Sequence, residues 1–209
     1  MGLVAWERRL RRQHDIPPVD RASWAKARIY NLWFDHSALR LIWTNQHEIA
    51  PGVFRSNNPT PGRLKRLKSD GIKSVLTLRG GSETAHYLTE KAYCAELGLA
   101  FHSIGFSDKQ APPAAGLLAL IDLFRRIEKP FVMHCKSGAD RAGLASVIYL
   151  LVIEGRPLDE AQKMLSPRFL HFKGSKTGIL DRVFDAYRAE GRGRSFEDWL
   201  RDGYVPEAI

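Results

Sequence analysis

From about residue 52 onward, short runs of apolar and β-branched residues alternate with longer stretches whose apolar positions recur with helical spacing. The runs predict strands at residues 53–55, 73–78, 99–104 and 130–134, and the longer stretches predict helices at residues 60–71, 82–97 and 112–128. Elements that alternate in this way form βαβ units, whose strands lie parallel. The pattern therefore predicts an α/β fold with a central, mainly parallel sheet of about four or five strands flanked by helices.

Helix boundaries are marked by the residues that usually start and stop helices. Thr60 followed by Pro61 is a typical helix start, and Gly71 is a typical stop. The segment at residues 144–154 is apolar nearly all round, which predicts a helix buried at the centre of the fold. Further helices are expected at residues 158–165, 178–190 and 195–202.

Residues 1–50 differ from the rest of the chain because they carry all but one of its five tryptophans, in surroundings with helical spacing. We interpret this region as a helical N-terminal extension that packs on the main domain. The main domain then spans residues 51–209 and ends in C-terminal helices. Tryptophan flanked by arginine is also typical of helices that lie on a membrane surface, and this alternative stays open.

The chain shows no sequence feature of a membrane-spanning or secreted protein. Its longest apolar run, at residues 147–153, is shorter than the roughly 18 residues that a membrane span needs. Its N-terminus becomes charged at once and lacks the pattern of a cleaved signal. Two cysteines, Cys94 and Cys135, are too few for a disulfide framework. We therefore expect a cytoplasmic protein, with peripheral contact to an anionic membrane as an open addition.

The 209-residue chain is basic, with a formal net charge of +9. Such a charge favours anionic partners, but it does not choose between nucleic acids, acidic lipid head groups and phosphorylated substrates. No recognised nucleic-acid-binding motif is present, so no specific nucleic acid is expected as a partner. The histidines and cysteines are scattered rather than spaced as ligand pairs, so we expect no metal site and no cofactor.

The most informative segment is the loop at residues 134–143, which joins a predicted strand to a predicted helix. Backbone N–H groups and the helix dipole at a helix N-terminus favour a bound anion such as phosphate. Cys135 precedes Arg141 by six positions, so one curled loop can hold a thiolate nucleophile together with a bidentate phosphate clamp. The loop positions that we expect to bind the substrate are Lys136, Ser137, Gly138 and Ala139.

The string His-Cys-X-X-Gly-X-X-Arg-X-Gly resembles the signature of the cysteine-dependent protein tyrosine phosphatase superfamily, especially its dual-specificity-like branch, and the resemblance covers about residues 50–190. It implies attack of Cys135 on a phosphate monoester, a cysteinyl-phosphate intermediate and hydrolysis without metal. Phosphotyrosine or phosphoserine/threonine proteins are the first interpretation of the substrate. Phospholipids or inositol phosphates are the alternative, favoured by the net charge, by Lys136 and by the Asp140-Arg141 pair.

A phosphatase of this kind needs a general acid, and two aspartates are candidates. Asp108 lies in a loop upstream of Cys135, where the resemblance places an acid on a mobile loop. Asp140, directly before Arg141, is similar to the Cys-X4-Asp-Arg form of myotubularin-like and Sac-like phosphoinositide phosphatases. The open alternatives are a capping role for Asp108 and an orienting role for Asp140 toward Arg141.

One position departs from the family pattern. The family usually has Ser or Thr directly after the arginine, where its hydroxyl stabilises the leaving thiolate, and this chain has Ala142. Either Ser137 or a water replaces that hydroxyl, or hydrolysis of the intermediate is slow. A phosphate-binding pseudophosphatase therefore stays a second, less favoured hypothesis.

Other residues carry weaker predictions. Arg79 ends a predicted strand at the edge where substrates bind open α/β folds, so it is a candidate for substrate binding. His134 is expected to support the geometry of Cys135 through hydrogen bonds to the loop backbone. Cys94 is expected to be an inert packed thiol, with a redox partner of Cys135 as the alternative. Lys173 and Lys176 are candidates for the mouth of the site, or for a solvated loop.

Overall fold

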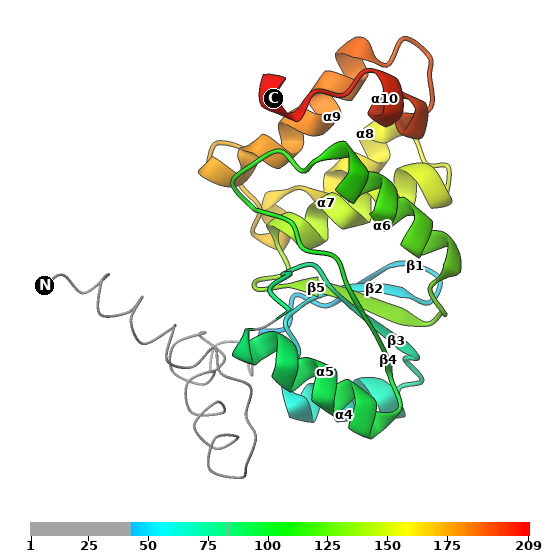
Figure 1. Ribbon diagram of the computed structural model, residues 1–209, viewed down its shortest axis with the longest axis vertical. Coiled ribbons are helices and arrows are strands. Elements are labelled where there is room, and N and C mark those ends of the chain that lie inside the picture. Colours follow the sequence, from blue (N-terminus) through cyan, green and yellow to red (C-terminus); the bar gives the residue numbers. More distant parts are fainter. Residues whose placement is uncertain (1–42, 83) are drawn as a thin grey trace, which may run out of the picture.

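A single five-stranded sheet crosses the part of the chain that the computed structural model describes, residues 43–82 and 84–209 (Figure 1). The strand order is β1-β2-β5-β3-β4; β1 is antiparallel to β2, and the other neighbours are parallel. This arrangement confirms the predicted α/β fold with a mainly parallel sheet. The strands are β1 (His47–Ala50), β2 (Val53–Asn57), β3 (Ser74–Thr77), β4 (Ala100–Ser103) and β5 (Phe131–Cys135).

Helices cover both faces of the sheet. Helices α4 and α5 lie on one face, and α6 and α7 lie on the other, with α8, α9 and α10 packed beyond them (Figure 1). Their bounds are α4 (Pro61–Ser69), α5 (Ala85–Leu97), α6 (Ala114–Arg126), α7 (Asp140–Ile148), α8 (Leu158–Ala161), α9 (Ile179–Glu190) and α10 (Phe196–Asp202). The π-helical η1 (Tyr149–Ile153) and the 3-10 turns η2 (Gln162–Met164), η3 (Pro167–Phe169) and η4 (Lys176–Gly178) lie between helices, and the 3-10 turn η5 (Pro206–Ala208) follows α10.

Local sequence accounts for most of these boundaries. The Thr60 hydroxyl accepts a hydrogen bond from the Arg63 N–H over 3.3 Å and caps α4, as predicted. Gly98 ends α5 in the left-handed conformation with φ of 63°. Helix α7 begins at Asp140, before the predicted start at residue 144. The polar first turn of α7 carries no apolar periodicity, whereas the carboxylate of Asp140 suits a helix N-terminus.

The structure corrects the predicted helical extension over residues 1–50 at its C-terminal end. Residues 47–50 form β1, which joins β2 through a tight turn at Pro51 and Gly52. Gly52 has φ of 73°, and its N–H donates to the Glu48 carboxylate over 2.9 Å. A hairpin partner of β2 therefore belongs to the sheet, which starts before residue 51. The rest of the predicted extension, residues 1–42, lies outside the described residues.

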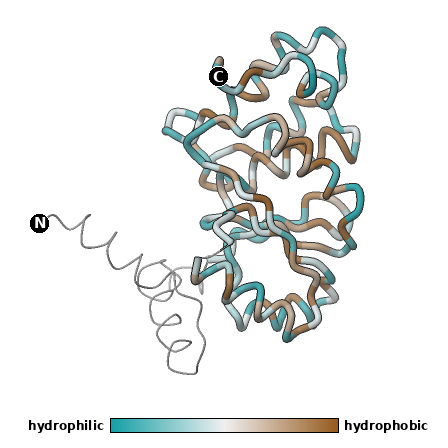
Figure 2. The backbone as a smooth tube through the Cα atoms, viewed as in Figure 1, coloured by the Kyte–Doolittle hydropathy of each residue, from teal (hydrophilic) through white to brown (hydrophobic). Residues whose placement is uncertain are grey.

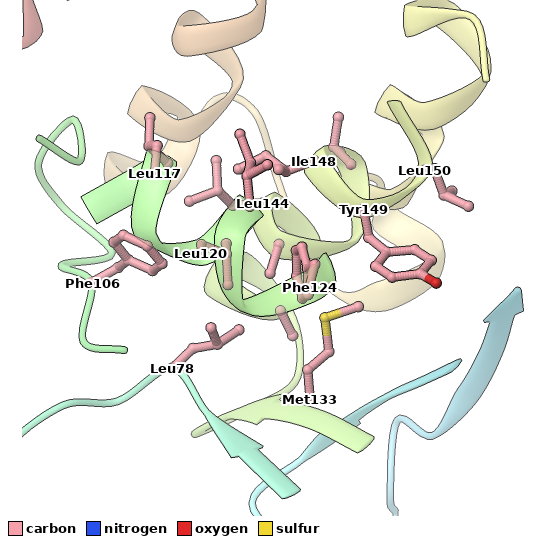
Figure 3. Packing of buried hydrophobic residues seen from close by; sticks show 14 of the residues in the cluster. Leu78, Phe106, Leu117, Leu120, Phe124, Met133, Leu144, Ile148, Tyr149 and Leu150 are labelled. Carbon is pink, nitrogen blue, oxygen red and sulfur yellow. The ribbon is translucent and has the colours of Figure 1, made fainter. Parts of the chain in front are cut away.

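Two apolar cores lie on opposite faces of the sheet. The larger core joins the sheet to α6, α7, α9 and α10, and the smaller one lies under α4 and α5. Figure 3 shows Met133 of β5 pointing into the larger core beside Phe124. Hydrophobic residues accordingly concentrate along the central strands and the helix segments next to them (Figure 2). Strand β5 is buried along its whole length, so both faces hold its C-terminal end in place.

Candidate active site

Cys135 is the last residue of β5, and the loop at residues 136–139 leads from it directly into α7. Its backbone lies in register with Asn57, the last residue of the neighbouring β2. The loop therefore stands at the carboxyl edge of the sheet, in front of a helix N-terminus, as the sequence predicts. The Cys135 side chain is buried in the larger core.

Gly138 allows the loop to pack directly against the end of β2. Its φ of 75° lies in the left-handed region. A Cβ atom at this position would lie 2.7 Å from the Asn57 nitrogen and 2.7 Å from the carbonyl carbon of Ser56. Both the backbone conformation and the close approach require glycine here. The Asn58 N–H donates to the Lys136 carbonyl over 3.4 Å and further ties the loop to the strand.

A fully buried cation, Arg55, lies beneath the loop, and no local sequence pattern predicts it. One terminal nitrogen of Arg55 donates to the carbonyl oxygens of Gly138, over 2.7 Å, and Ala139, over 3.1 Å. The other donates to the Met164 carbonyl over 2.7 Å. Because the C=O and N–H of a peptide unit point in opposite directions, holding these two carbonyls turns the adjoining N–H groups away from Arg55.

The charge of Arg55 persists in this buried position. Burial lowers its pKa to about 10, against the opposing effect of the nearby Cys135 and Asp140. The side chain is therefore cationic at neutral pH. Its guanidinium also lies 4.0 Å from the centre of the Phe169 ring, a cation–π contact.

Arg141, in the first turn of α7, lies close to Asp108, which comes from the loop between β4 and α6. Arg141 Nη2 lies 3.8 Å from Asp108 Oδ2, and Nη1 donates to the Phe106 carbonyl over 3.4 Å. The Asp108 side chain is 37% exposed, whereas that of Arg141 is largely covered. Arg141 Nε is buried and has no hydrogen-bond partner among residues 43–82 and 84–209. This leaves a guanidinium donor for an oxyanion at the point where the Asp108 loop meets the Cys135 loop.

Asp140, the second candidate acid, makes different contacts. Its Oδ1 lies 2.8 Å from Nδ1 of His171, whose Nε2 lies 2.6 Å from Oδ2 of Asp181. Burial raises the pKa of Asp140, but hydrogen bonds from His171 and Thr177 outweigh that effect and hold the pKa below its ordinary value. Asp140 is thus a carboxylate at neutral pH, and this argues against its service as a proton donor.

The remaining candidate residues make contacts within the loop or at the edge of the sheet beside it. The Ser137 hydroxyl accepts a hydrogen bond from the Ala139 N–H over 3.3 Å, and the Ser137 carbonyl accepts one from Asn45 over 3.2 Å. Lys136 is partly exposed. Arg79 donates to the side chain of Asn58, whose N–H contacts the loop, so Arg79 stands at the predicted edge of the sheet.

The structure also places three further candidate residues, His134, Lys173 and Ala142. His134 lies on the α5 side of the sheet, where its Nε2 is 2.7 Å from the buried Glu90 carboxylate, because neighbouring residues of a strand face opposite sides. Its contact is therefore with α5 rather than with the loop backbone. Lys173 forms an exposed 2.8 Å ion pair with Asp185. Ala142 is fully buried, and its carbonyl accepts a 2.6 Å hydrogen bond from the Ser146 hydroxyl.

Cys94 packs in the smaller core, on the other side of the sheet from Cys135. Burial, with a further contribution from Glu90, raises its pKa to about 12. These surroundings support an inert thiol and provide no contact with Cys135.

Within the described ranges, no group of three or more His, Cys, Asp or Glu residues is arranged to hold a metal ion. Of the helices in the same part of the chain, none combines the length and the apolar character needed to cross a bilayer.

The fold and the loop define a phosphatase of the cysteine-dependent protein tyrosine phosphatase superfamily. A family model described as "Polymorphic toxin system, DSP-PTPase phosphatase" matches residues 50–155, and the chain belongs to this family. The protein is accordingly a cysteine-based, metal-independent phosphatase, as the resemblance in sequence implied. No curated protein matches the chain.

Solved structures share the fold at low sequence identity. TpbA of P. aeruginosa is 22% identical with a TM-score of 0.55, and the match covers 76% of this chain and 89% of TpbA. The active form of Tk-PTP is 22% identical with a TM-score of 0.54, covering 68% of this chain and 97% of that one. PTPMT1 is 19% identical with a TM-score of 0.53, covering 70% and 98%.

Proposed function

We propose that Cys135 is the nucleophile of phosphate monoester hydrolysis, that Arg141 holds the phosphate and that Asp108 is the general acid. The contact between Arg141 and the Asp108 loop carries this assignment, because it brings a partly exposed carboxyl group to the phosphate clamp. Asp140 is bound by His171 instead. Asp140 then serves the loop as a fixed carboxylate rather than as a proton donor.

The proposed reaction has two steps. In the first, the Cys135 thiolate attacks phosphorus, the bond from phosphorus to the ester oxygen breaks, and Asp108 gives its proton to the leaving oxygen. In the second, water attacks the cysteinyl phosphate, Asp108 takes a proton from that water, and the thiolate leaves. Loop N–H groups, the α7 dipole and Arg141 stabilise the negative charge on the phosphoryl oxygens in both steps.

For the substrate class, we propose phosphotyrosine or phosphoserine/threonine in proteins as the first candidate. The family description, which names a DSP-PTPase phosphatase, supports this choice. TpbA, which shares the fold, has been solved in complex with pTyr.

Phospholipids or inositol phosphates are the second candidate, and a specific surface favours them. Leu170 and Phe172 flank the buried His171 and are 50% and 54% exposed. Exposed basic side chains, Arg168, Lys173 and Lys176, lie on the same segment. Apolar side chains among cations suit an anionic membrane surface, and we include peripheral membrane contact from the cytoplasmic side in this second candidate. PTPMT1 has been solved in complex with PI(5)P.

The chemistry is tested with Cys135→Ser. We expect this variant to lose phosphatase activity and to keep phosphate-ester binding, because the hydroxyl is a poor nucleophile in an unchanged loop. Vanadate should inhibit the wild type, whereas EDTA should not. Activity that survives the substitution and needs a metal would overturn the mechanism. Binding without turnover in the wild type would establish a phosphate-binding pseudophosphatase.

A substrate panel then separates the two classes. Phosphotyrosine and phosphoserine peptides are compared with phosphoinositides and phosphatidylglycerophosphate by kcat/KM, with Cys135→Ser as the blank. A higher kcat/KM for peptides supports the first candidate, and a higher value for lipids in vesicles supports the second. Growth of cells that express wild type or Cys135→Ser tests whether the toxin context in the family description extends to this chain.

A further inference from the structure

His171 joins two acidic side chains from different helices. The residue is fully buried in the segment between η3 and η4. Its Nδ1 lies 2.8 Å from Asp140 at the start of α7, and its Nε2 lies 2.6 Å from Asp181 in the first turn of α9. Both ring nitrogens are therefore engaged by carboxylates.

At the position of Asp140, a carboxylate that was free to move would interfere with phosphate binding by Arg141. Asp140 is adjacent to Arg141 in the loop, and the two side chains interact electrostatically. Carboxylates and phosphates bind the same bidentate face of a guanidinium, so a mobile Asp140 would compete with the substrate for Arg141. Its negative charge would also repel a phosphate dianion in the loop.

We propose that His171 is a positioning residue, which holds the Asp140 carboxylate away from Arg141 and so keeps the guanidinium available to the phosphate of the substrate. The proposal rests on the proposed function of the loop and extends it to a residue outside the signature. Asp181 completes the arrangement, because its contact with Nε2 fixes the ring with Nδ1 directed at Asp140.

The charges around the ring agree with this role. Burial lowers the pKa of His171, but hydrogen bonds to Asp140 and Asp181 outweigh burial and raise the pKa to about 9. The ring is thus an imidazolium at neutral pH, with carboxylates on both sides. Thr177 also contributes a hydrogen bond to Asp140, and Arg141 is the other charged group that acts on it. A residue that only filled space would not need two charged partners.

The test is a double-mutant cycle of His171→Gln with Asp140→Asn, read out as competitive inhibition by inorganic phosphate and by vanadate. Glutamine removes the positive charge and frees Asp140. We expect the inhibition constants and the KM of an aryl phosphate to rise roughly tenfold or more in His171→Gln, with a smaller change in kcat. In the double variant no carboxylate is left to compete, so the inhibition constants should return to within about threefold of those of Asp140→Asn alone.

Asp185→Asn is the matched control, because it removes an acidic charge from the same helix, α9, at a residue whose hydrogen-bond partners are Lys173, Gln162 and Arg188 rather than His171. It should lower the melting temperature while phosphate inhibition stays within about twofold of the wild type. If His171→Gln fails to fold, His171→Gln with Asp181→Asn avoids the unpaired buried carboxylate and is measured in its place.

Two outcomes overturn the proposal. One is unchanged phosphate inhibition in a folded His171 variant. The other is weakened inhibition that Asp140→Asn does not restore, which would show that His171 acts only through folding. Failure of the proposed function is recognised separately, since the wild type would then show neither turnover nor inhibition by vanadate.

Discussion

Arg55 donates a 2.7 Å hydrogen bond to the carbonyl oxygen of Gly138, so a strand residue fixes the backbone of a loop that lies 83 positions further along the chain. The guanidinium is completely buried and is the charged donor to the carbonyls of Gly138, Ala139 and Met164. The loop therefore depends on β2 for its shape as much as on its own sequence. Among residues outside the loop, Arg55 is therefore the one whose substitution should disturb the loop structure most.

Arg55→Met should destabilise the protein by about 3 kcal/mol or more, because carbonyls of Gly138, Ala139 and Met164 lose a charged donor. The kcat/KM should fall at least roughly tenfold, since the loop N–H groups lose their orientation. Urea unfolding and steady-state kinetics measure the two effects. Arg66→Met is the matched control, because its side chain is 84% exposed and should change stability by less than about 0.5 kcal/mol. Equal changes in stability and in kcat/KM for the two variants would show that Arg55 does not support the loop.

Asp108→Asn and Asp140→Asn distinguish the general acid from a fixed carboxylate. An alkoxide leaving group needs protonation far more than an aryl oxide does. We expect Asp108→Asn to lower kcat roughly 100-fold or more with an alkyl phosphate and much less with an aryl phosphate. Asp140→Asn should affect both substrates to the same extent. The reverse pattern would assign the proton transfer to Asp140.

Ala142→Ser tests whether breakdown of the cysteinyl phosphate limits turnover. The Ala142 side chain has no hydroxyl to donate to the departing thiolate, and the nearby Ser146 hydroxyl donates to the Ala142 carbonyl. Rapid mixing of the wild type with an aryl phosphate should show a burst of leaving group equivalent to the enzyme. Serine should raise the steady rate by at most roughly ten to a hundredfold, the value of one charge-assisted hydrogen bond. A wild type without a burst, together with an unimproved variant, would mean that another donor already acts there.

His171 should make the stability of the fold depend on pH. Its folded-state pKa of about 9 lies above the ordinary value of 6.5. The stabilisation is therefore complete below about pH 6.5 and is lost as the pH rises through 9, with a size of roughly 3 kcal/mol. Urea unfolding of wild type and His171→Gln at pH 6 and pH 9.5 measures it. The difference between the two proteins should be large at pH 6 and small at pH 9.5, and a constant difference would argue against a charged ring.

Much of the fold can be predicted from the sequence because its local signals agree with its tertiary structure. Strand β5 is buried and apolar except for His134, and Thr60 and Gly98 stand where α4 starts and α5 ends. The exception, β1, has four residues and forms only as the partner of β2. Its one local signal is the Pro51-Gly52 turn, which is typical of a chain reversal between two strands.

The site is predictable only where its parts are neighbours in the sequence. Cys135 and Arg141 share one loop, so their spacing indicates their proximity. Arg55 and His171 meet loop residues 83 and 31 positions away, and no spacing rule connects them. The orientation of His134 is a different case, because alternation along β5 already assigns it to the face opposite Cys135.

The two cysteines lie in separate cores, and this placement limits how the enzyme can recover activity after oxidation. A nucleophilic thiolate is the first group that peroxide attacks, and the resulting sulfenic acid is rescued most simply by a second thiol in the same protein. Cys94 is the only other cysteine of the chain, and the sheet lies between it and Cys135. Recovery of an oxidised Cys135 then depends on small thiols from the surroundings. Where these run short, oxidation continues to the irreversible sulfinic acid, and phosphatase activity follows the thiol supply of its compartment.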